Sequence, residues 1–148
     1  MIKPQRLINS QSGFTLIEIV VVLIIIAGLV AVVAPNIMNR LSDSNEKITR
    51  AKIANLETAL KLFKVDNGFY PETGQGLNAL NEFPSTGREP KRWKGPYLEK
   101  SQTPLDAWSS EFVYVGPDQT NNGTYLIISV GEDAVANTDD DISSNDVQ

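Results

Sequence analysis

The sequence predicts an α+β protein in which one long amino-terminal α-helix packs on a small antiparallel β-sheet. Three observations support this fold. An apolar run covers residues 14–34, and an amphipathic helical pattern continues from it to about residue 65. Two short segments rich in β-branched residues, 111–115 and 125–130, are separated by turn residues and indicate paired strands. We therefore expect a helix with a membrane-spanning half and an amphipathic half.

The apolar run at residues 14–34 is long enough to cross a bilayer. About 21 residues with a rise of about 1.5 Å each form a helix of about 31 Å. Thr15 and Glu18 are polar residues within this run. A carboxylate in hydrocarbon costs about 2.5–3.5 kcal/mol on insertion scales, so we expect Glu18 to have a partner or a function.

A polar leader, residues 1–13, precedes the apolar run. It contains Lys3 and Arg6 and no acidic residue. By the positive-inside rule, the amino terminus is cytoplasmic and the chain after Ala34 lies on the far side of the membrane. A secretory cleavage site after the run is disfavoured because Pro35 follows Ala34 directly.

The junction between leader and apolar run has the sequence Gly13-Phe14-Thr15-Leu16-Ile17-Glu18. It resembles the class III signal of type IV pilins and type II secretion pseudopilins. The resemblance implies that prepilin peptidase cleaves between Gly13 and Phe14 and methylates the new amino terminus of Phe14. It also implies that Glu18 neutralises the amino terminus of a neighbouring subunit during filament assembly. A simple type I membrane anchor with an incidental glutamate is the alternative.

The composition excludes several classes of function. The formal net charge is -5, which argues against a nucleic-acid partner. The chain has no histidine and no cysteine, so imidazole catalysis, the common zinc sites and disulfides are excluded. A membrane-anchored enzyme would be limited to carboxylate chemistry, and the carboxylates cluster in the tail. We therefore expect no enzymatic activity.

The amphipathic half of the helix is predicted from Ile53, Leu56, Leu60 and Phe63, which form one apolar stripe. Pairs at i,i+4, Glu46 with Arg50 and Glu57 with Lys61, are expected on the opposite face. Pro35 should kink or locally melt the helix at Ala34-Pro35. Asp66-Asn67-Gly68 should end it, because Asn and Gly tolerate the left-handed cap conformation.

Beyond the helix, Leu77 and Leu80, with Phe83 as a further member, suggest a short helix. Trp93 and Tyr97 flank Gly95-Pro96, and we expect both aromatic side chains to pack in the core.

The middle of the chain resembles the major pseudopilins of type II secretion systems. The matching motifs are Tyr70-Pro71, Gln75-Gly76-Leu77, Trp93-Lys94-Gly95-Pro96-Tyr97-Leu98, and Pro104-Leu105-Asp106-Ala107-Trp108 followed by Tyr114. Ala107 stands where that family usually has proline, and Ser109 where it usually has glycine. The resemblance implies a type IV pilin-like fold with a removed leader at 1–13, a transmembrane and assembly helix at 14–34 and a periplasmic domain at 35–148.

The same resemblance implies a function in assembly. The chain would be a structural subunit of a periplasmic pseudopilus that drives export of folded proteins across the outer membrane. Its implied partners are further copies of itself in a helical polymer, minor pseudopilins, the inner-membrane assembly platform, prepilin peptidase and the inner membrane. A type IV pilin of a surface pilus is the alternative, although such pilins commonly carry a carboxy-terminal disulfide.

The tail from residue 132 onward is acidic. It contains six carboxylates and no basic residue, the six being Glu132, Asp133, Asp139, Asp140, Asp141 and Asp146. Composition alone favours a solvated acidic tail, although hard oxygen ligands at this density also suit calcium.

Resemblance to the major pseudopilins favours a calcium site in this tail. It implies ligation by the carboxylates of Asp133, Asp140 and Asp141 and the backbone carbonyls of Val130 and Val135, with Asp139 as a substitute if the register shifts. After Ile142 the family usually continues with glycine and an aromatic residue, whereas this chain has Ser143-Ser144-Asn145.

Overall fold

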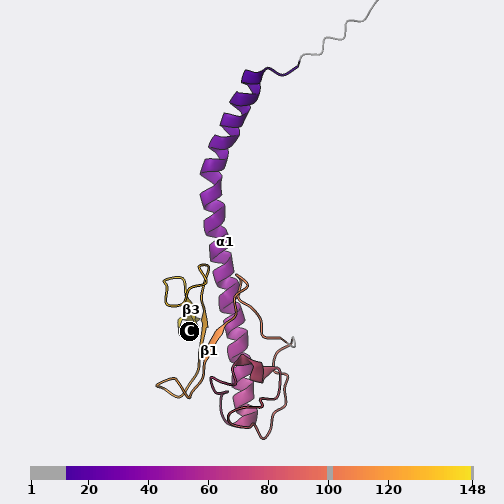
Figure 1. The fold of residues 1–148 in the computed structure, drawn as a ribbon, viewed down its shortest axis with the longest axis vertical. Helices are drawn as coiled ribbons and strands as arrows, with labels where there is room; N and C mark the ends of the chain where they lie inside the picture. Colours follow the sequence, from indigo (N-terminus) through magenta and orange to yellow (C-terminus); the bar gives the residue numbers. More distant parts are fainter. Residues whose placement is uncertain (1–12, 100–101, 148) are drawn as a thin grey trace, which may run out of the picture. The chain divides into compact units, whose positions relative to one another are not determined.

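The structure, a computed structural model, describes residues 13–99 and 102–147. It consists of two compact units, 1–40 and 41–148, which are described separately below. The elements, shown in Figure 1, are helix α1 (Leu16–Asn67), the 3-10 helix η1 (Leu77–Leu80), strands β1 (Val113–Val115), β2 (Leu126–Ser129) and β3 (Ile142–Ser143), and the 3-10 helix η2 (Ser144–Val147). The predicted leader lies outside the described residues except for Gly13.

Helix α1 begins at Leu16 because Thr15 caps it. The amide of Glu18 donates to the Thr15 hydroxyl at 3.3 Å and to the Thr15 carbonyl at 3.1 Å. A threonine at the cap with glutamate three residues later is the capping-box sequence, and a carboxylate in the first turn also interacts favourably with the helix dipole. Gly13 and Phe14 therefore stay outside the helix.

In the first unit, the apolar side chains of α1 that the structure describes are exposed. The helix is long and apolar enough to cross a membrane. It continues through Pro35, so the predicted melting at Ala34-Pro35 is absent. Proline removes one hydrogen bond, to the carbonyl of Ala31 four residues earlier, and the hydrogen bonds on either side maintain the helix.

The core of the second unit forms on the predicted stripe of α1. Ile53, Leu56, Leu60 and Phe63 are completely buried. They pack with Leu77, Ala79 and Leu80 of η1 and with Phe112, Tyr114, Ile127 and Ile142 from the region of the sheet. The predictions of the apolar helix face and of a short helix near residues 77–80 are confirmed.

The carboxy-terminal end of α1 also follows the prediction. Gly68 has a φ of 82° and its amide donates to the carbonyl of Lys64 at 2.7 Å. This left-handed glycine cap satisfies a carbonyl of the last helical turn.

The sheet has the order β1-β2-β3, with both neighbouring pairs antiparallel. Tyr114 of β1 lies opposite Ile127 of β2, and both side chains are buried toward the core. Strand β3 was not predicted, because two residues are too few to produce an alternating pattern.

Trp93 and Tyr97 pack against the core, as predicted. The Trp93 indole donates to the Ala79 carbonyl at 3.0 Å, and the ring centroids of Phe63 and Tyr97 are 5.5 Å apart. The expected pair of Glu46 with Arg50 is present at 2.8 Å. Glu57 differs from the prediction, since its carboxylate accepts a hydrogen bond from the Tyr125 hydroxyl at 3.2 Å.

Candidate functional site

The first candidate site is the amino-terminal end of α1. Phe14 is 79% exposed and lies two residues before the first helical residue. The Thr15 cap therefore leaves the Gly13-Phe14 bond in a non-helical segment directly next to a helix. A protease needs a substrate backbone that is not folded into a helix, and residues 13–15 are non-helical.

The second candidate site is the loop at residues 132–141, called the acidic loop below. Its centre is the Thr138 hydroxyl, which no sequence pattern singled out. This oxygen lies 2.7 Å from Asp140 Oδ1, 2.9 Å from the Val135 carbonyl, 3.4 Å from Asp133 Oδ1 and 3.5 Å from Asp141 Oδ1. Four of the five oxygen donors predicted for calcium thus gather around one atom.

The other carboxylate oxygens of the acidic loop accept hydrogen bonds from backbone amides. Asp140 Oδ2 accepts from the amides of Glu132 at 2.7 Å and Asp133 at 3.1 Å, and Asp141 Oδ2 accepts from Asn137 at 2.8 Å. The Thr138 hydroxyl, together with the amides of Asp133 and Glu132, holds the pKa of Asp140 below its usual value. The loop is therefore ordered around its own carboxylates.

The donor chemistry of the acidic loop suits calcium, which binds carboxylate and carbonyl oxygens. Across residues 13–99 and 102–147, however, no three acidic side chains are arranged to hold a metal ion. The Thr138 hydroxyl lies among the oxygens instead. An ion in this loop would have to take over the contacts that the hydroxyl makes, or include the hydroxyl among its ligands.

The remaining predicted ligands lie at the edge of the acidic loop. Val130 follows β2 directly and is half-buried, whereas Asp139 is exposed. Gly131 has a φ of 67°, and a Cβ atom at this position would collide with the carboxylate of Asp140. Glycine at 131 is therefore what allows Asp140 to lie against the end of β2.

A third polar cluster, centred on Asp106, connects the segment before β1 to the core. Asp106 is 3% exposed and accepts hydrogen bonds from the Ser129 hydroxyl at 2.6 Å, the Ser110 amide at 2.8 Å and the Trp108 amide at 3.0 Å. Ser109 within this turn has a φ of 73°, in the left-handed region that favours glycine. The resembling family usually has glycine at position 109, and this chain forms the turn with serine instead.

Helix α1 holds the same segment through two side chains. Lys52 Nζ donates to the carbonyls of Leu105 at 2.7 Å and Asp106 at 3.2 Å, and the Thr49 hydroxyl accepts from the Ala107 amide at 3.2 Å. The sequence indicates Asp106 only as part of a motif, because a lone aspartate two residues before a tryptophan does not predict burial.

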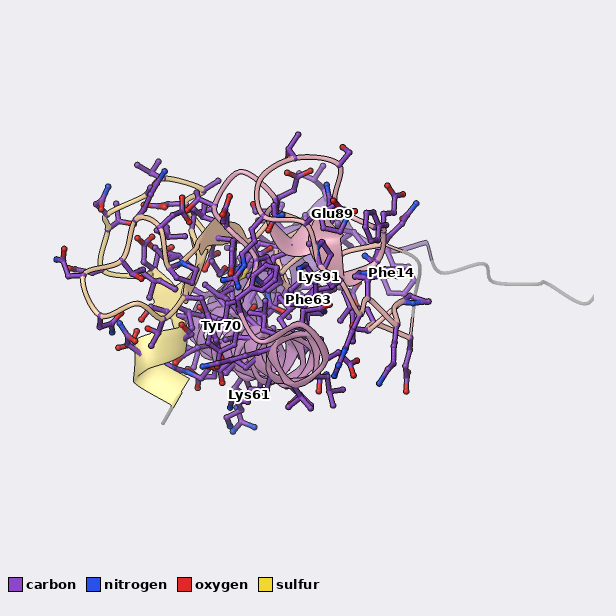
Figure 2. The ribbon with its side chains drawn as sticks, turned by 90° about the horizontal axis from the view of Figure 1, so that it is seen from below. Phe14, Lys61, Phe63, Tyr70, Glu89 and Lys91 are labelled. Atoms are coloured by element: carbon purple, nitrogen blue, oxygen red, sulfur yellow. The ribbon has the colours of Figure 1, made fainter. Side chains whose placement is uncertain are left out.

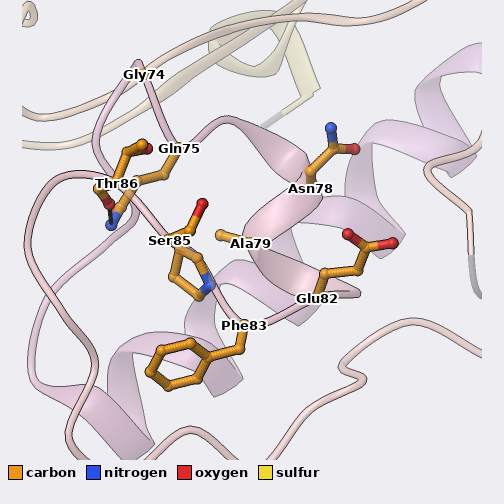
Figure 3. A pocket seen from close by; sticks show the side chains of 9 residues that line it. Gly74, Gln75, Asn78, Ala79, Glu82, Phe83, Ser85 and Thr86 are labelled. Carbon is orange, nitrogen blue, oxygen red and sulfur yellow. Dashed lines mark hydrogen bonds between the residues drawn. The ribbon is translucent and has the colours of Figure 1, made fainter.

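A shallow pocket of about 200 Å³ lies between η1 and the segment at residues 82–86 (Figure 3). Gln75 closes one side of it, because its Nε2 donates to the carbonyls of Thr86 at 2.7 Å and Arg88 at 2.9 Å. Its Oε1 accepts from the Glu72 amide at 2.9 Å. All polar atoms of Gln75 thus serve loop structure, and nothing about the pocket indicates a ligand.

Comparison with known proteins gives matches over most of the chain. A family described as "Type II secretion system (T2SS), protein G" matches residues 36–145, and a prokaryotic N-terminal methylation motif matches residues 8–34. Type II secretion system core protein G of Aeromonas hydrophila is 38% identical over 92% of this chain and 93% of its own length. Core protein G of Escherichia coli K12 is 36% identical over 94% of each chain.

Among solved structures, the major pseudopilin from the type 2 secretion system of enterohaemorrhagic Escherichia coli matches with a TM-score of 0.64 and 32% identity. The match covers 74% of this chain and 94% of that one. A helix that begins within a methylation motif and packs on a small antiparallel sheet defines a pilin-like subunit. The chain belongs to the protein G family of the type II secretion system.

Proposed function

We propose that the chain is a major pseudopilin, the structural subunit of a periplasmic pseudopilus that drives export of folded proteins by type II secretion. The observation that carries this proposal is the family match over residues 36–145, together with relatives aligned over more than nine-tenths of the chain. The structural likeness to a major pseudopilin supports it. The proposal gives the protein a role in assembly and no catalytic role.

Deletion of the gene tests this function. We expect exoprotein release to be lost while surface pili remain, and expression of the chain to restore release. The opposite pattern, intact release with loss of surface pili, would favour a type IV pilin. Normal release and normal pili in the deletion strain would contradict both functions.

The proposal includes processing of the amino terminus. Prepilin peptidase removes residues 1–13 and methylates the amine of Phe14. The methylation-motif match and the non-helical Gly13-Phe14 segment ahead of the Thr15 cap support this step. Amino-terminal sequencing of the mature protein should begin at Phe14, and any other start would refute the cleavage site.

We place the mature subunit in the inner membrane with its amino terminus cytoplasmic and residues 35–148 periplasmic. The exposed apolar half of α1 supports a membrane anchor, and Lys3 and Arg6 in the leader support this orientation. Its partners would be the peptidase, the inner-membrane assembly platform, minor pseudopilins and further copies of the chain.

Glu18 is proposed to pair with the Phe14 amine of a neighbouring copy once the leader is removed. In the single chain the Glu18 amide is engaged by Thr15, while its carboxylate lies on an exposed face of α1. Glu18→Ala should leave insertion and cleavage intact and impair assembly. Thr15→Ala is the matched control, because it weakens the helix cap without removing the carboxylate. Normal filaments from Glu18→Ala would exclude the pairing.

Calcium is proposed to bind in the acidic loop through Asp133, Asp140, Asp141 and the Val135 carbonyl, with the Val130 carbonyl as a further ligand. The convergence of oxygens on Thr138 supports this placement. Binding should raise the melting temperature, because an ion that binds only the folded state stabilises it. Asp140→Asn should abolish the calcium-dependent rise. Glu132→Gln, at a carboxylate of the same loop outside the predicted ligand set, should preserve it, and an unchanged melting temperature after chelation of the wild type would refute the site.

A further inference from the structure

The second unit carries a cationic loop next to the end of α1. Residues 87–94, called the basic loop below, contain four basic residues and one acidic residue. The Arg92 amide donates to Asn67 Oδ1 at 3.2 Å, and Lys94 forms an ion pair with Asp66 at 2.7 Å. Figure 2, a view from below relative to Figure 1, labels Glu89 and Lys91 of this loop.

The basic loop is held in a defined position. The Gln75 side chain donates to the carbonyls of Thr86 and Arg88, and the Arg88 guanidinium lies 4.3 Å from the ring centroid of Phe69. The side chains of Lys91 and Arg92 are exposed, and none of the described residues forms a hydrogen bond or an ion pair with either. The loop thus presents two available cations on a fixed backbone.

The acidic loop lies beside a much earlier part of α1. The Ser42 hydroxyl donates to the Glu132 carboxylate at 3.3 Å, whereas the basic loop contacts residues 66 and 67. The 24 residues of helix between Ser42 and Asp66 correspond to about 36 Å. The acidic loop contains five carboxylates and no basic residue, so it stays negative even after it binds one divalent cation.

Charges of opposite sign therefore lie far apart along α1 within the same unit. At physiological ionic strength the Debye length is about 8 Å, so the two loops of one molecule hardly interact with each other. A second copy displaced along the α1 direction brings its acidic loop to the basic loop of the first. Such a contact joins two different surfaces, and head-to-tail contacts of this kind produce open filaments when they do not close into rings.

We propose that the basic loop of one copy binds the acidic loop of a second copy, with Lys91 and Arg92 facing Glu132 and Asp139. The proposal rests on the proposed function, which supplies the polymer. Exposed ion pairs contribute little individually, so the contact sets the register of neighbouring copies and speeds their encounter more than it adds affinity.

Cysteine cross-linking of the full-length protein in its native membrane tests this contact, because the chain has no cysteine of its own. Lys91→Cys combined with Asp139→Cys should give a ladder of dimers, trimers and larger species on mild oxidation, which reductant reverses. A disulfide requires Cα atoms within about 7 Å, so these two sites cannot be joined within one molecule. Each single substitution should give only background dimers. Lys91→Cys with Gln119→Cys, which places the second cysteine at an exposed uncharged residue, is the matched control.

Absence of the ladder with normal subunit levels, or an equal ladder from the control pair, overturns the proposal.

Charge reversal is the second measurement. Lys91→Glu with Arg92→Glu should lower filament yield several-fold, and Glu132→Lys with Asp139→Lys in the same chain should restore it. Unchanged yield, or a loss that the opposite reversal does not restore, also overturns the contact. If only the proposed contact is wrong, the wild type secretes and the deletion strain does not. If the proposed function is wrong, the deletion strain secretes normally.

Discussion

Asp106→Ala should destabilise the second unit strongly, although Asp106 lies in a loop. Three donors converge on its carboxylate, from Ser129, Ser110 and Trp108, at 2.6–3.0 Å. Ser129 is completely buried, so water cannot replace the carboxylate as an acceptor for its hydroxyl in the native packing. The substitution thus leaves a buried hydroxyl and two loop amides without their acceptor.

The expected loss follows from these contacts. A hydrogen bond to a charged group contributes about 1.5–3 kcal/mol, and an unsatisfied buried donor costs about 1–3 kcal/mol. Partial hydration of the two amides lowers the sum, so we expect a decrease of about 3–5 kcal/mol in the free energy of unfolding. Since domains are stable by about 5–15 kcal/mol, this is a large fraction of the total. The melting temperature should fall by about 15 °C or more.

Urea unfolding of the mature chain in mild detergent, followed by tryptophan fluorescence, measures the effect. Trp108 lies two residues from Asp106 and reports on the turn. Asp139→Ala is the control, because this exposed aspartate should change stability by less than about 0.5 kcal/mol. A cycle with Ser129→Ala isolates the coupling between the two side chains. A loss below about 1 kcal/mol for Asp106→Ala would show that the cluster does not hold the turn.

Three further predictions concern backbone strain, pH and the acidic loop. Ser109→Gly should raise the unfolding free energy by about 1 kcal/mol, because glycine adopts the left-handed φ of 73° without a Cβ penalty, whereas Ser109→Ala should give no gain. The Thr73 amide and hydroxyl hold the pKa of Asp118 below 3.8. The ionised carboxylate therefore stabilises the folded state above that pH, and this contribution is lost as the pH falls further. Between pH 5 and pH 3, the free energy of unfolding should decrease less for Asp118→Asn than for the wild type. Gly131→Ala should displace Asp140 and abolish calcium-dependent stabilisation in thermal melts, and retained calcium dependence would contradict the packing seen at Gly131.

The helix and its buried face were predictable because they depend on repeated local patterns. The spacing of Ile53, Leu56, Leu60 and Phe63 determines one face, and Gly68 marks the end of α1 through a conformation that few other residues adopt. Local melting at Pro35 does not occur, since the loss of one hydrogen bond does not interrupt a helix that continues on both sides, whereas the alternative of a kink at Ala34-Pro35 stays a prediction.

The polar contacts within the second unit were not predictable in the same way. Thr138 is unremarkable in the sequence, and its position among four loop oxygens depends on how the acidic loop turns back toward β2. Glu57 has Lys61 at helical spacing, yet it binds Tyr125, which is distant in sequence. Such long-range pairings depend on tertiary packing, whereas sequence patterns report mainly local neighbours.

The three strands contain only three, four and two residues, so the sheet supplies few regular backbone hydrogen bonds. Hydrogen exchange should therefore find most slowly exchanging amides in α1, while the loops exchange at rates set by side-chain anchors such as Gln75, Thr49 and Asp106. Substitution tolerance should follow the same division. These polar side chains should accept fewer replacements than exposed strand residues such as Val113. In a library of random variants selected for folding, the loop amides and carboxylates should therefore vary as little as buried apolar residues usually do.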